Sequence, residues 1–163
     1  MKRADLIKNK ILTRAEAVHK VAQLRYLDKT IVFTNGVFDI LHEGHIYSLS
    51  AAAVEGNFLI VGLNADMSVK RLKGDDRPIN PENSRAVVLA SLVMVDAVVL
   101  FEEDTPLELI KALLPDVLVK GGDYTIEQVA GAREVLAAGG RVLINPILEG
   151  FSTSSTINRM KNS

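Results

Sequence analysis

Residues 31–49, which read IVFTNGVFDILHEGHIYSL, constrain the fold more than any other part of the sequence. The segment begins with β-branched and aromatic residues, passes through Asn35-Gly36, and continues into apolar residues at helical spacing behind His42-Glu43-Gly44-His45. β-branched residues favour strands, Asn-Gly favours turns, and apolar residues at helical spacing favour a helix. The segment therefore predicts a strand, a turn and a helix in succession.

Four further apolar runs of strand length follow, at residues 58–63, 97–101, 117–120 and 141–144, and helical segments separate them. Strands that alternate with helices predict an open parallel sheet with right-handed crossovers. We expect a Rossmann-like, doubly wound α/β fold with a five-stranded parallel sheet. At 163 residues the chain is long enough for one core, so we expect a single domain over residues 1–163, with residues 1–12 flexible.

Three segments carry the Thr-x-x-Glu/Gln pattern of a capping box, in which the first and last side chains each accept a hydrogen bond from the other's backbone N–H. They begin at Thr13, Thr105 and Thr125. The sequence predicts a helix at each point, and the last of these helices should run to the glycine pair at residues 139–140.

Charge and cysteine content exclude several classes of function. With 19 basic and 20 acidic residues the net charge is -1, so no overall positive field favours nucleic acid or a membrane surface, and we expect neither partner. The absence of cysteine excludes disulfides and thiol nucleophiles and suits a reducing compartment, so we expect a cytoplasmic protein. The longest apolar stretch, residues 86–101, is shorter than the roughly 20 residues of a membrane helix.

In a doubly wound sheet, ligands bind beyond the carboxyl ends of the strands. Four of the predicted strands are followed by polar turns, which we expect to gather at one edge of the sheet. These turns carry Asn35-Gly36, Asn64, residues 121–123 and residues 149–150.

His42 and His45 lie at the start of a predicted helix, where free N–H groups and the helix dipole favour an anion. Gly36 and Gly44 allow close approach to the backbone, and imidazoles donate hydrogen bonds, so the segment predicts a triphosphate cradle. For two isolated histidines the simpler interpretation is that one is a capping or core residue and the other a metal ligand. The flanking glycines and the strand-turn-helix setting favour the triphosphate cradle instead. No G-x-x-x-x-G-K-[ST] or G-x-G-x-x-G motif is present.

A basic cluster of Lys70, Arg71, Lys73 and Arg77 follows the second predicted strand. A solvated helix face is the simpler interpretation, but its position beyond the carboxyl end of a strand also suits a lid that clamps phosphate. Residues 152–154, all with hydroxyl groups, either cap the last helix or hold a phosphate at its N-terminus.

Two segments resemble the signatures of a known superfamily. FTNGVFDILHEGH is similar to the H-x-G-H signature of the cytidylyltransferase-like nucleotidyltransferases, and EGFSTSSTI is similar to their second signature. SVKRLKGDDRPIN, FEEDTP, PDVLVKGGDY and LAAGGRVL resemble the adenylyltransferase domain of bacterial D-glycero-D-manno-heptose 1-phosphate enzymes. The resemblance implies transfer of AMP from ATP, bound with Mg²⁺, to heptose 1-phosphate, giving ADP-heptose for lipopolysaccharide synthesis and pyrophosphate. It also suggests a homodimer.

The resemblance implies catalytic and substrate-binding roles for five residues. His42 and His45 would contact the β- and α-phosphoryl oxygens. Lys73, helped by Lys70, would close over the α-phosphate and the sugar phosphate, and Arg85 would reach the substrate phosphate or support this lid. Because the attacking phosphate is already ionised, the protein's task would be alignment and charge stabilisation.

The resemblance also implies a set of nucleotide-binding residues. Asn35, Gly36 and Phe38 would shape the turn beneath the phosphates, and Asp39 would orient a histidine or hold Mg²⁺ indirectly. The others, four at the ribose and base and two at the β- and γ-phosphates, would be Lys120, Gly121, Gly122, Asp123, Ser152 and Thr153.

Both signatures are shared across the superfamily, so alternatives stay open. The nearest is a cytidylyltransferase acting on glycerol 3-phosphate or another small phosphorylated alcohol, and a further one is a nucleotide-binding module without activity. Related heptose enzymes often carry cysteine at the positions of Val37 and Phe151, which we interpret as changes of packing. We expect a separate kinase and phosphatase to supply the sugar phosphate.

Overall fold

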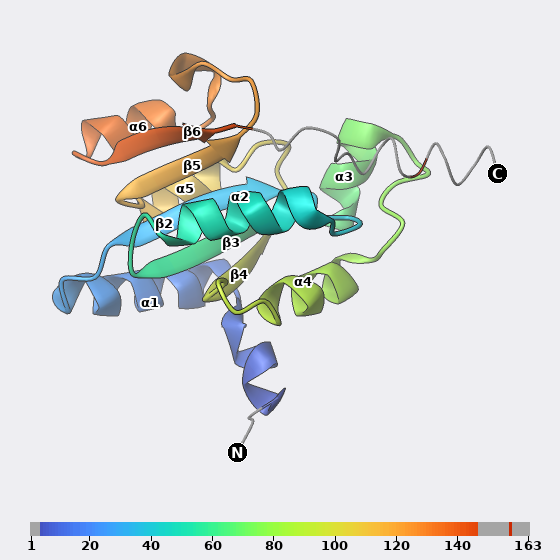
Figure 1. Ribbon diagram of the computed structural model, residues 1–163, viewed down its shortest axis with the longest axis horizontal. Coiled ribbons are helices and arrows are strands. Elements are labelled where there is room, and N and C mark those ends of the chain that lie inside the picture. The colour runs from blue at the N-terminus through green and yellow to red at the C-terminus, as the bar shows by residue number, and fades with distance from the viewer. Residues whose placement is uncertain (1–3, 147–156, 158–163) are drawn as a thin grey trace.

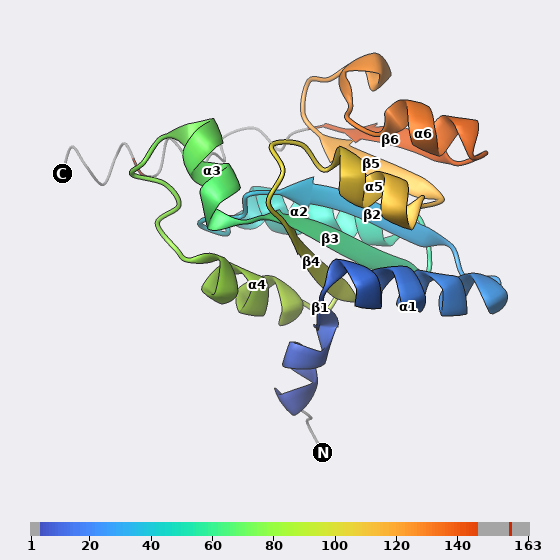
Figure 2. The ribbon, with the colours of Figure 1, turned by 180° about the vertical axis from the view of Figure 1, so that it is seen from behind.

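A computed structural model describes residues 4–146 and residue 157. In this part of the chain, six parallel strands form one sheet in the order β1-β4-β3-β2-β5-β6 (Figure 1; β1 is labelled in Figure 2). The strands are β1 (Ile11–Leu12), β2 (Ile31–Gly36), β3 (Phe58–Asn64), β4 (Ala97–Phe101), β5 (Val117–Gly121) and β6 (Arg141–Asn145). The predicted α/β class and all five predicted strands are confirmed.

The predicted count of five strands is wrong, because β1 adds a sixth strand at one edge. Ile11 is in register with Val98 of β4, and the preceding residues form the 3-10 helix η1 (Ala4–Lys10). The ammonium group of Lys10 donates a hydrogen bond of 2.6 Å to the carbonyl oxygen of Val95. Residues 1–12 were expected to be flexible, and this stays a prediction; of these residues, 10–12 make the long-range contacts just described. A two-residue strand is too short for a recognisable alternation of apolar residues.

Helices cover both faces of the sheet, as Figure 1 and the reverse view in Figure 2 show. One face is covered by α1 (Arg14–Tyr26), α5 (Leu107–Leu113) and α6 (Ala132–Ala137), and the other by α2 (Glu43–Ala53) and α4 (Glu82–Ala90). The alternation of a strand is visible in β2, where Ile31 and Phe33 enter the first core and Val32 the second. The helix α3 (Asp66–Lys73) follows β3, and the 3-10 helix η2 (Ile126–Gln128) follows β5.

The predicted helix starts are confirmed in part. At α1, the Thr13 hydroxyl accepts a hydrogen bond from the Glu16 N–H (3.2 Å), and the Glu16 carboxylate accepts one from the Thr13 N–H (2.7 Å). Thr125 also forms its capping box, but this opens only η2, and α6 begins separately. Thr105 does not cap α5, which begins after Pro106. The pattern therefore marked the start of an α-helix at Thr13, the start of a 3-10 helix at Thr125, and no cap at Thr105.

Among residues 4–146 and at residue 157, no helix is long and apolar enough to cross a membrane.

The strand order changes direction at β2. The strands β3 and β4 follow β2 towards one edge, and β5 and β6 lie towards the other. The strands β2 and β5 pair only through Val32 with Val117 and Phe33 with Leu118. Their carboxyl-terminal parts are therefore not paired with each other. Adjacent strands that separate at such a switch point leave a crevice, which is where α/β sheets of this kind bind ligands.

Candidate active site

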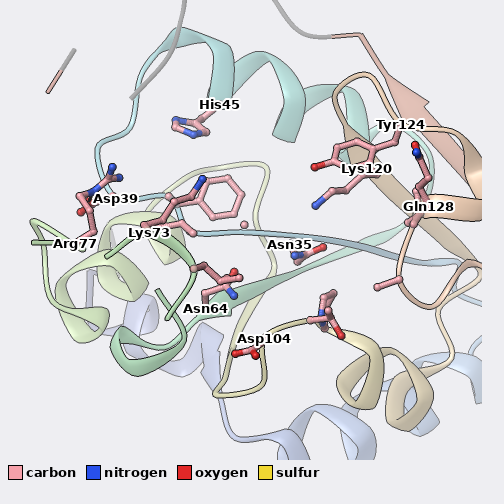
Figure 3. A pocket seen from close by; sticks show the side chains of 18 residues that line it. Asn35, Asp39, His45, Asn64, Lys73, Arg77, Asp104, Lys120, Tyr124 and Gln128 are labelled. Carbon is pink, nitrogen blue, oxygen red and sulfur yellow. Dashed lines mark hydrogen bonds and ion pairs between the residues drawn. The ribbon is translucent and has the colours of Figure 1, made fainter. Parts of the chain in front are cut away.

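A cavity of about 500 Å³ lies where β2 and β5 separate (Figure 3). It is lined by the carboxyl ends of β2, β3 and β5 and by segments that follow β2, β3, β4 and β5. The polar and charged lining residues are Asn35, Asp39, His45, Asn64, Lys73, Arg77, Asp104, Thr105, Lys120, Tyr124 and Gln128. The cavity therefore combines cationic, amide, hydroxyl and carboxylate groups from segments that are distant in the sequence.

His45, in the first turn of α2, presents a neutral imidazole to this cavity. Burial, and then the neighbouring His42, lowers the pKa of His45 from 6.5 to about 4. Its Nδ1 atom accepts a hydrogen bond of 3.3 Å from the backbone N–H of His42. Because a neutral imidazole carries one proton, an accepting Nδ1 places that proton on Nε2. The ring therefore offers an N–H donor, which suits an anionic oxygen.

His42 does not line the cavity as His45 does. The two rings are stacked, with centroids 3.9 Å apart and planes inclined by 26°. Burial lowers the pKa of His42, so this ring is also neutral near pH 7. The structure brings the two histidines together as predicted and places only His45 on the cavity wall.

Phe38 fixes the turn between β2 and α2. Its ring centroid lies 5.3 Å from that of His45, and its backbone has a φ of 47°. A Cβ atom at Gly36 would lie 2.9 Å from a ring carbon of Phe38, so a larger residue there would displace the ring. The predicted role of both residues in shaping the turn thus has a steric basis.

Asp39 anchors the connection between α3 and α4. Its fully buried carboxylate accepts hydrogen bonds from the Arg77 Nε (2.8 Å) and from the backbone N–H groups of Ile79 (2.8 Å) and Asn80 (2.9 Å). Burial raises the pKa of this carboxyl, but the N–H groups of Asn80 and Ile79 and the Arg77 guanidinium outweigh that effect, and the pKa lies below its usual value. These contacts go to the loop, whereas we expected contacts to a histidine or to Mg²⁺.

Potential metal ligands do not form a cluster in the described residues. Within residues 4–146 and 157, no group of three or more histidine, aspartate or glutamate side chains could hold a metal ion. The Asp39 carboxylate, the expected neighbour of the metal, is engaged with three donors from the loop.

Of the two predicted lid lysines, Lys73 lines the cavity and Lys70 does not. Lys73 belongs to the last turn of α3, and Figure 3 shows its side chain directed into the cavity. The adjacent Arg71 points to a different partner, because its Nε donates a hydrogen bond of 2.7 Å to the carboxylate of Asp104. The basic segment is therefore divided between the cavity and the surface.

Arg85 is buried, and its guanidinium joins three segments around the cavity through four acceptors. Its nitrogens donate hydrogen bonds to the carbonyl oxygens of Val37 (2.7 Å), Asn64 (2.8 Å) and Asn80 (2.9 Å) and to the carboxylate of Asp66 (2.7 Å). Only 2% of this residue is exposed, and it does not line the cavity. Of its two predicted roles, this geometry fits support of the lid and not contact with a substrate phosphate.

Lys120 and Tyr124 lie on the opposite side of the cavity from Lys73 and Arg77 (Figure 3). The Lys120 ammonium group lies 5.3 Å from the centroid of the Tyr124 ring, and burial lowers the pKa of Lys120. An aromatic ring beside a partly buried cation suits a nucleotide base and its phosphates. Of the predicted residues 120–123, only Lys120 lines the cavity.

Two predicted phosphate-binding residues, Ser152 and Thr153, lie outside the described residues. Conversely, the lining includes Asn64, which was expected only as part of a polar turn at this edge, and it adds Asp104 and Gln128, which were not predicted. A signal for Asp104 was available, because residues 102–105 follow the carboxyl end of β4 and so fall at the same edge as the other turns. Gln128 lies seven residues beyond the end of β5, where no local pattern identifies it.

Comparison with known proteins gives a consistent result. Residues 33–159 match the family model described as Cytidylyltransferase-like. The bifunctional protein HldE of Acidiphilium cryptum (strain JF-5) is 53% identical over 153 residues, which are 94% of this chain and 32% of that protein. The bifunctional protein HldE of Koribacter versatilis (strain Ellin345) is 55% identical over 150 residues, 92% of this chain and 31% of that protein. The chain thus spans about a third of the length of these relatives.

Two solved structures share the fold. The lipopolysaccharide core biosynthesis protein of Thermoplasma volcanium GSS1 has a TM-score of 0.59 and 32% sequence identity, covering 74% of this chain and 97% of that one. The pantoate-beta-alanine ligase of Francisella tularensis has a TM-score of 0.59 at 16% identity, covering 94% of this chain and 72% of that one. The second likeness concerns the fold alone.

The match to the family model supports a nucleotidyltransferase, and the parallel sheet, the polar cavity at its switch point and the histidine pair at a helix start fit that class. The chain belongs to the cytidylyltransferase-like family.

Proposed function

We propose that this nucleotidyltransferase transfers AMP from ATP to heptose 1-phosphate. A phosphate oxygen of the sugar attacks the α-phosphorus of ATP and forms a new P–O bond. The bond from the α-phosphorus to the oxygen that bridges the β-phosphorus breaks, and its electron pair leaves with pyrophosphate. ATP enters as its Mg²⁺ complex, and ADP-heptose is the other product. A phosphate monoester with a second pKa of about 6 is largely a dianion at pH 7, so the attack needs no general base.

The observation that carries this proposal is the neutral His45 on the cavity wall, with its proton on Nε2. Negative charge moves onto the phosphoryl oxygens as pyrophosphate departs, and a fixed donor stabilises that charge without reorganisation. Lys73 and Lys120 add positive charge from opposite sides of the same cavity. These residues align and stabilise the reacting groups, and no covalent nucleophile is needed.

The heptose acceptor is supported by the resemblance of four sequence stretches to heptose 1-phosphate adenylyltransferases. It is also supported by the 32% identity to a protein described as acting in lipopolysaccharide core biosynthesis. The family name favours one alternative, transfer of CMP from CTP to glycerol 3-phosphate or another small phosphorylated alcohol. Both reactions use the same phosphate chemistry and differ in the base and the acceptor.

A panel of pyrophosphate-release assays separates the two reactions. The panel crosses ATP and CTP with α-heptose 1-phosphate, β-heptose 1-phosphate and glycerol 3-phosphate. We expect turnover with ATP and one heptose 1-phosphate anomer. Turnover with CTP alone would refute the proposal, and ATP binding without any turnover would identify an inactive nucleotide-binding module.

His45→Ala tests the role of the donor in the same assay. We expect kcat to fall by about 10²–10³-fold, the cost of removing one transition-state donor. His19→Ala is the matched control, because His19 lies on the exposed surface of α1, where its ring bonds to Gln23 (3.0 Å). Near-normal pyrophosphate release by His45→Ala would contradict the assignment.

A homodimer and action in the cytoplasm remain predictions that accompany this proposal. Sedimentation equilibrium of the purified chain measures the first.

A further inference from the structure

Arg77 lines the cavity, and its guanidinium has more N–H donors than its contacts with the protein occupy. It lies between α3 and α4, lines the cavity, and has a side chain that is 11% exposed. Its Nε donates to the Asp39 carboxylate at 2.8 Å. Within the described part of the chain, no residue accepts a hydrogen bond from its two terminal nitrogens. A guanidinium has five N–H donors in a planar fork, so up to four remain for a ligand.

Asp39 holds this guanidinium in place. The carboxylate is fully buried and also accepts the N–H groups of Ile79 and Asn80, so the loop is fixed within three residues of Arg77. Arg85 ties the same loop to the ends of β2 and β3 through the carbonyl oxygens of Asn80, Val37 and Asn64. A charged group held in this way loses little conformational entropy when it binds a ligand.

The position of Arg77 indicates which ligand it meets. Figure 3 shows Arg77 and Lys73 on one side of the cavity and Lys120, Tyr124 and Gln128 on the other. An aromatic ring beside a partly buried cation suits a nucleotide base, so we place the base of ATP beside Tyr124 and its α-phosphate at the donor of His45. The side of Arg77 and Lys73 is then left for the second substrate, whose phosphate dianion matches a bidentate guanidinium.

We infer that Arg77 is a substrate-binding residue whose terminal amino groups bind the phosphate of the acceptor, and that Asp39 is the positioning residue for its guanidinium. The inference rests on the proposed function, which supplies the acceptor. It deepens that function, because Arg77, which the sequence placed only in a basic cluster, receives a specific role in recognising the phosphate of the acceptor.

Steady-state kinetics of pyrophosphate release test the inference in Arg77→Lys. Lysine keeps the positive charge beside Asp39, but a single ammonium cannot bond to the carboxylate through one nitrogen and to a phosphate through two others. We expect KM for the acceptor to rise about 10- to 100-fold, because this is the loss of affinity that follows when one hydrogen bond to a charged group is removed. KM for ATP should change less than about threefold, because the nucleotide uses other residues.

Two further variants complete the design. Asp39→Asn should raise KM for the acceptor in the same direction, because an amide cannot accept all three of the donors that the carboxylate accepts. Arg141→Lys is the control: its side chain is 56% exposed, pairs with Glu55 at 2.8 Å and does not line the cavity. Far-UV circular dichroism and a thermal melt establish that each variant is folded. Calorimetric titration of the acceptor into each variant, with a non-hydrolysable ATP analogue present, measures binding without turnover.

Each outcome decides a different point. An unchanged acceptor KM in folded Arg77→Lys would show a purely structural ion pair and overturn the inference alone. An equal or larger rise of KM for ATP would assign Arg77 to the nucleotide and also overturn it. Wild-type turnover with glycerol 3-phosphate in place of a heptose phosphate would refute the proposed acceptor, and the same comparison of KM values would then be made with glycerol 3-phosphate. A wild-type protein that is inactive with every acceptor would refute both.

Discussion

Replacing His45 with glutamine should remove part of the acid sensitivity of the fold. Burial and the neighbouring His42 lower the pKa of His45 from 6.5 to about 4. Between these pH values the unfolded chain binds a proton at this position and the folded chain does not. The free energy of unfolding therefore decreases as the pH falls from 6.5 to 4, and no further loss from this group occurs below that range.

The size of the effect follows from the two pKa values. At about 1.4 kcal/mol per pKa unit, proton linkage gives a loss of about 2 kcal/mol between pH 7 and pH 5 for a fully buried ring. The ring of His45 is partly exposed, and solvent screening reduces this to about 1 kcal/mol. Glutamine does not titrate in this range, so the variant should not show this loss.

Urea denaturation at pH 7 and at pH 5 measures the difference. Wild type should lose about 1 kcal/mol more than His45→Gln between the two pH values. His19→Gln is the control, because it removes a histidine from the exposed surface of α1. Carboxylates that titrate near pH 5 are the same in all three proteins, so their effect cancels in the comparison. Equal losses in wild type and His45→Gln would refute the argument that burial keeps this imidazole neutral.

Three other substitutions test separate parts of the structure. Lys73→Ala should abolish turnover and retain ATP binding by calorimetry, because Lys73 lines the cavity from the lid; wild-type activity would place it on a solvated face. Arg85→Ala should lower the free energy of unfolding by about 3–5 kcal/mol, since it leaves a carboxylate and three carbonyl oxygens without their donor; Arg85→Lys should recover only part in the same urea titration. Gly131→Ala should destabilise by about 1–3 kcal/mol more than Gly139→Ala. Both glycines have a φ of 85°, but only a Cβ at Gly131 would meet Ile110, at 2.7 Å, so equal melting temperatures would contradict the steric argument.

Local patterns in the sequence predicted the elements of the fold where each element is long enough to show its own periodicity. Five apolar runs gave five strands, and Thr13 with Glu16 gave the start of α1. Their alternation with helices implied a parallel sheet, and a parallel sheet implied that the turns after its strands would share an edge. This argument predicted Asn35 at the site, the helix start and the basic cluster suggested His45 and Lys73, and the family resemblance added Lys120; all four line one cavity.

The parts that escaped prediction depend on contacts between distant segments. Strand β1 exists because two residues pair with β4, and their own sequence carries no alternation. Local sequence rules carry no information about such partners, which lie dozens of residues away.

The sequence by itself determined the order of strands and helices, the parallel sheet and the histidine pair at the start of α2, because short-range periodicity and turn chemistry encode them. Only the tertiary structure decided the state of the groups in the site. It showed that His45 is neutral, that Asp39 serves the loop through Arg77, and that Arg85 is buried away from the cavity. Burial and long-range hydrogen bonds set the charge and direction of a side chain, and both arise only when segments far apart in the chain come together.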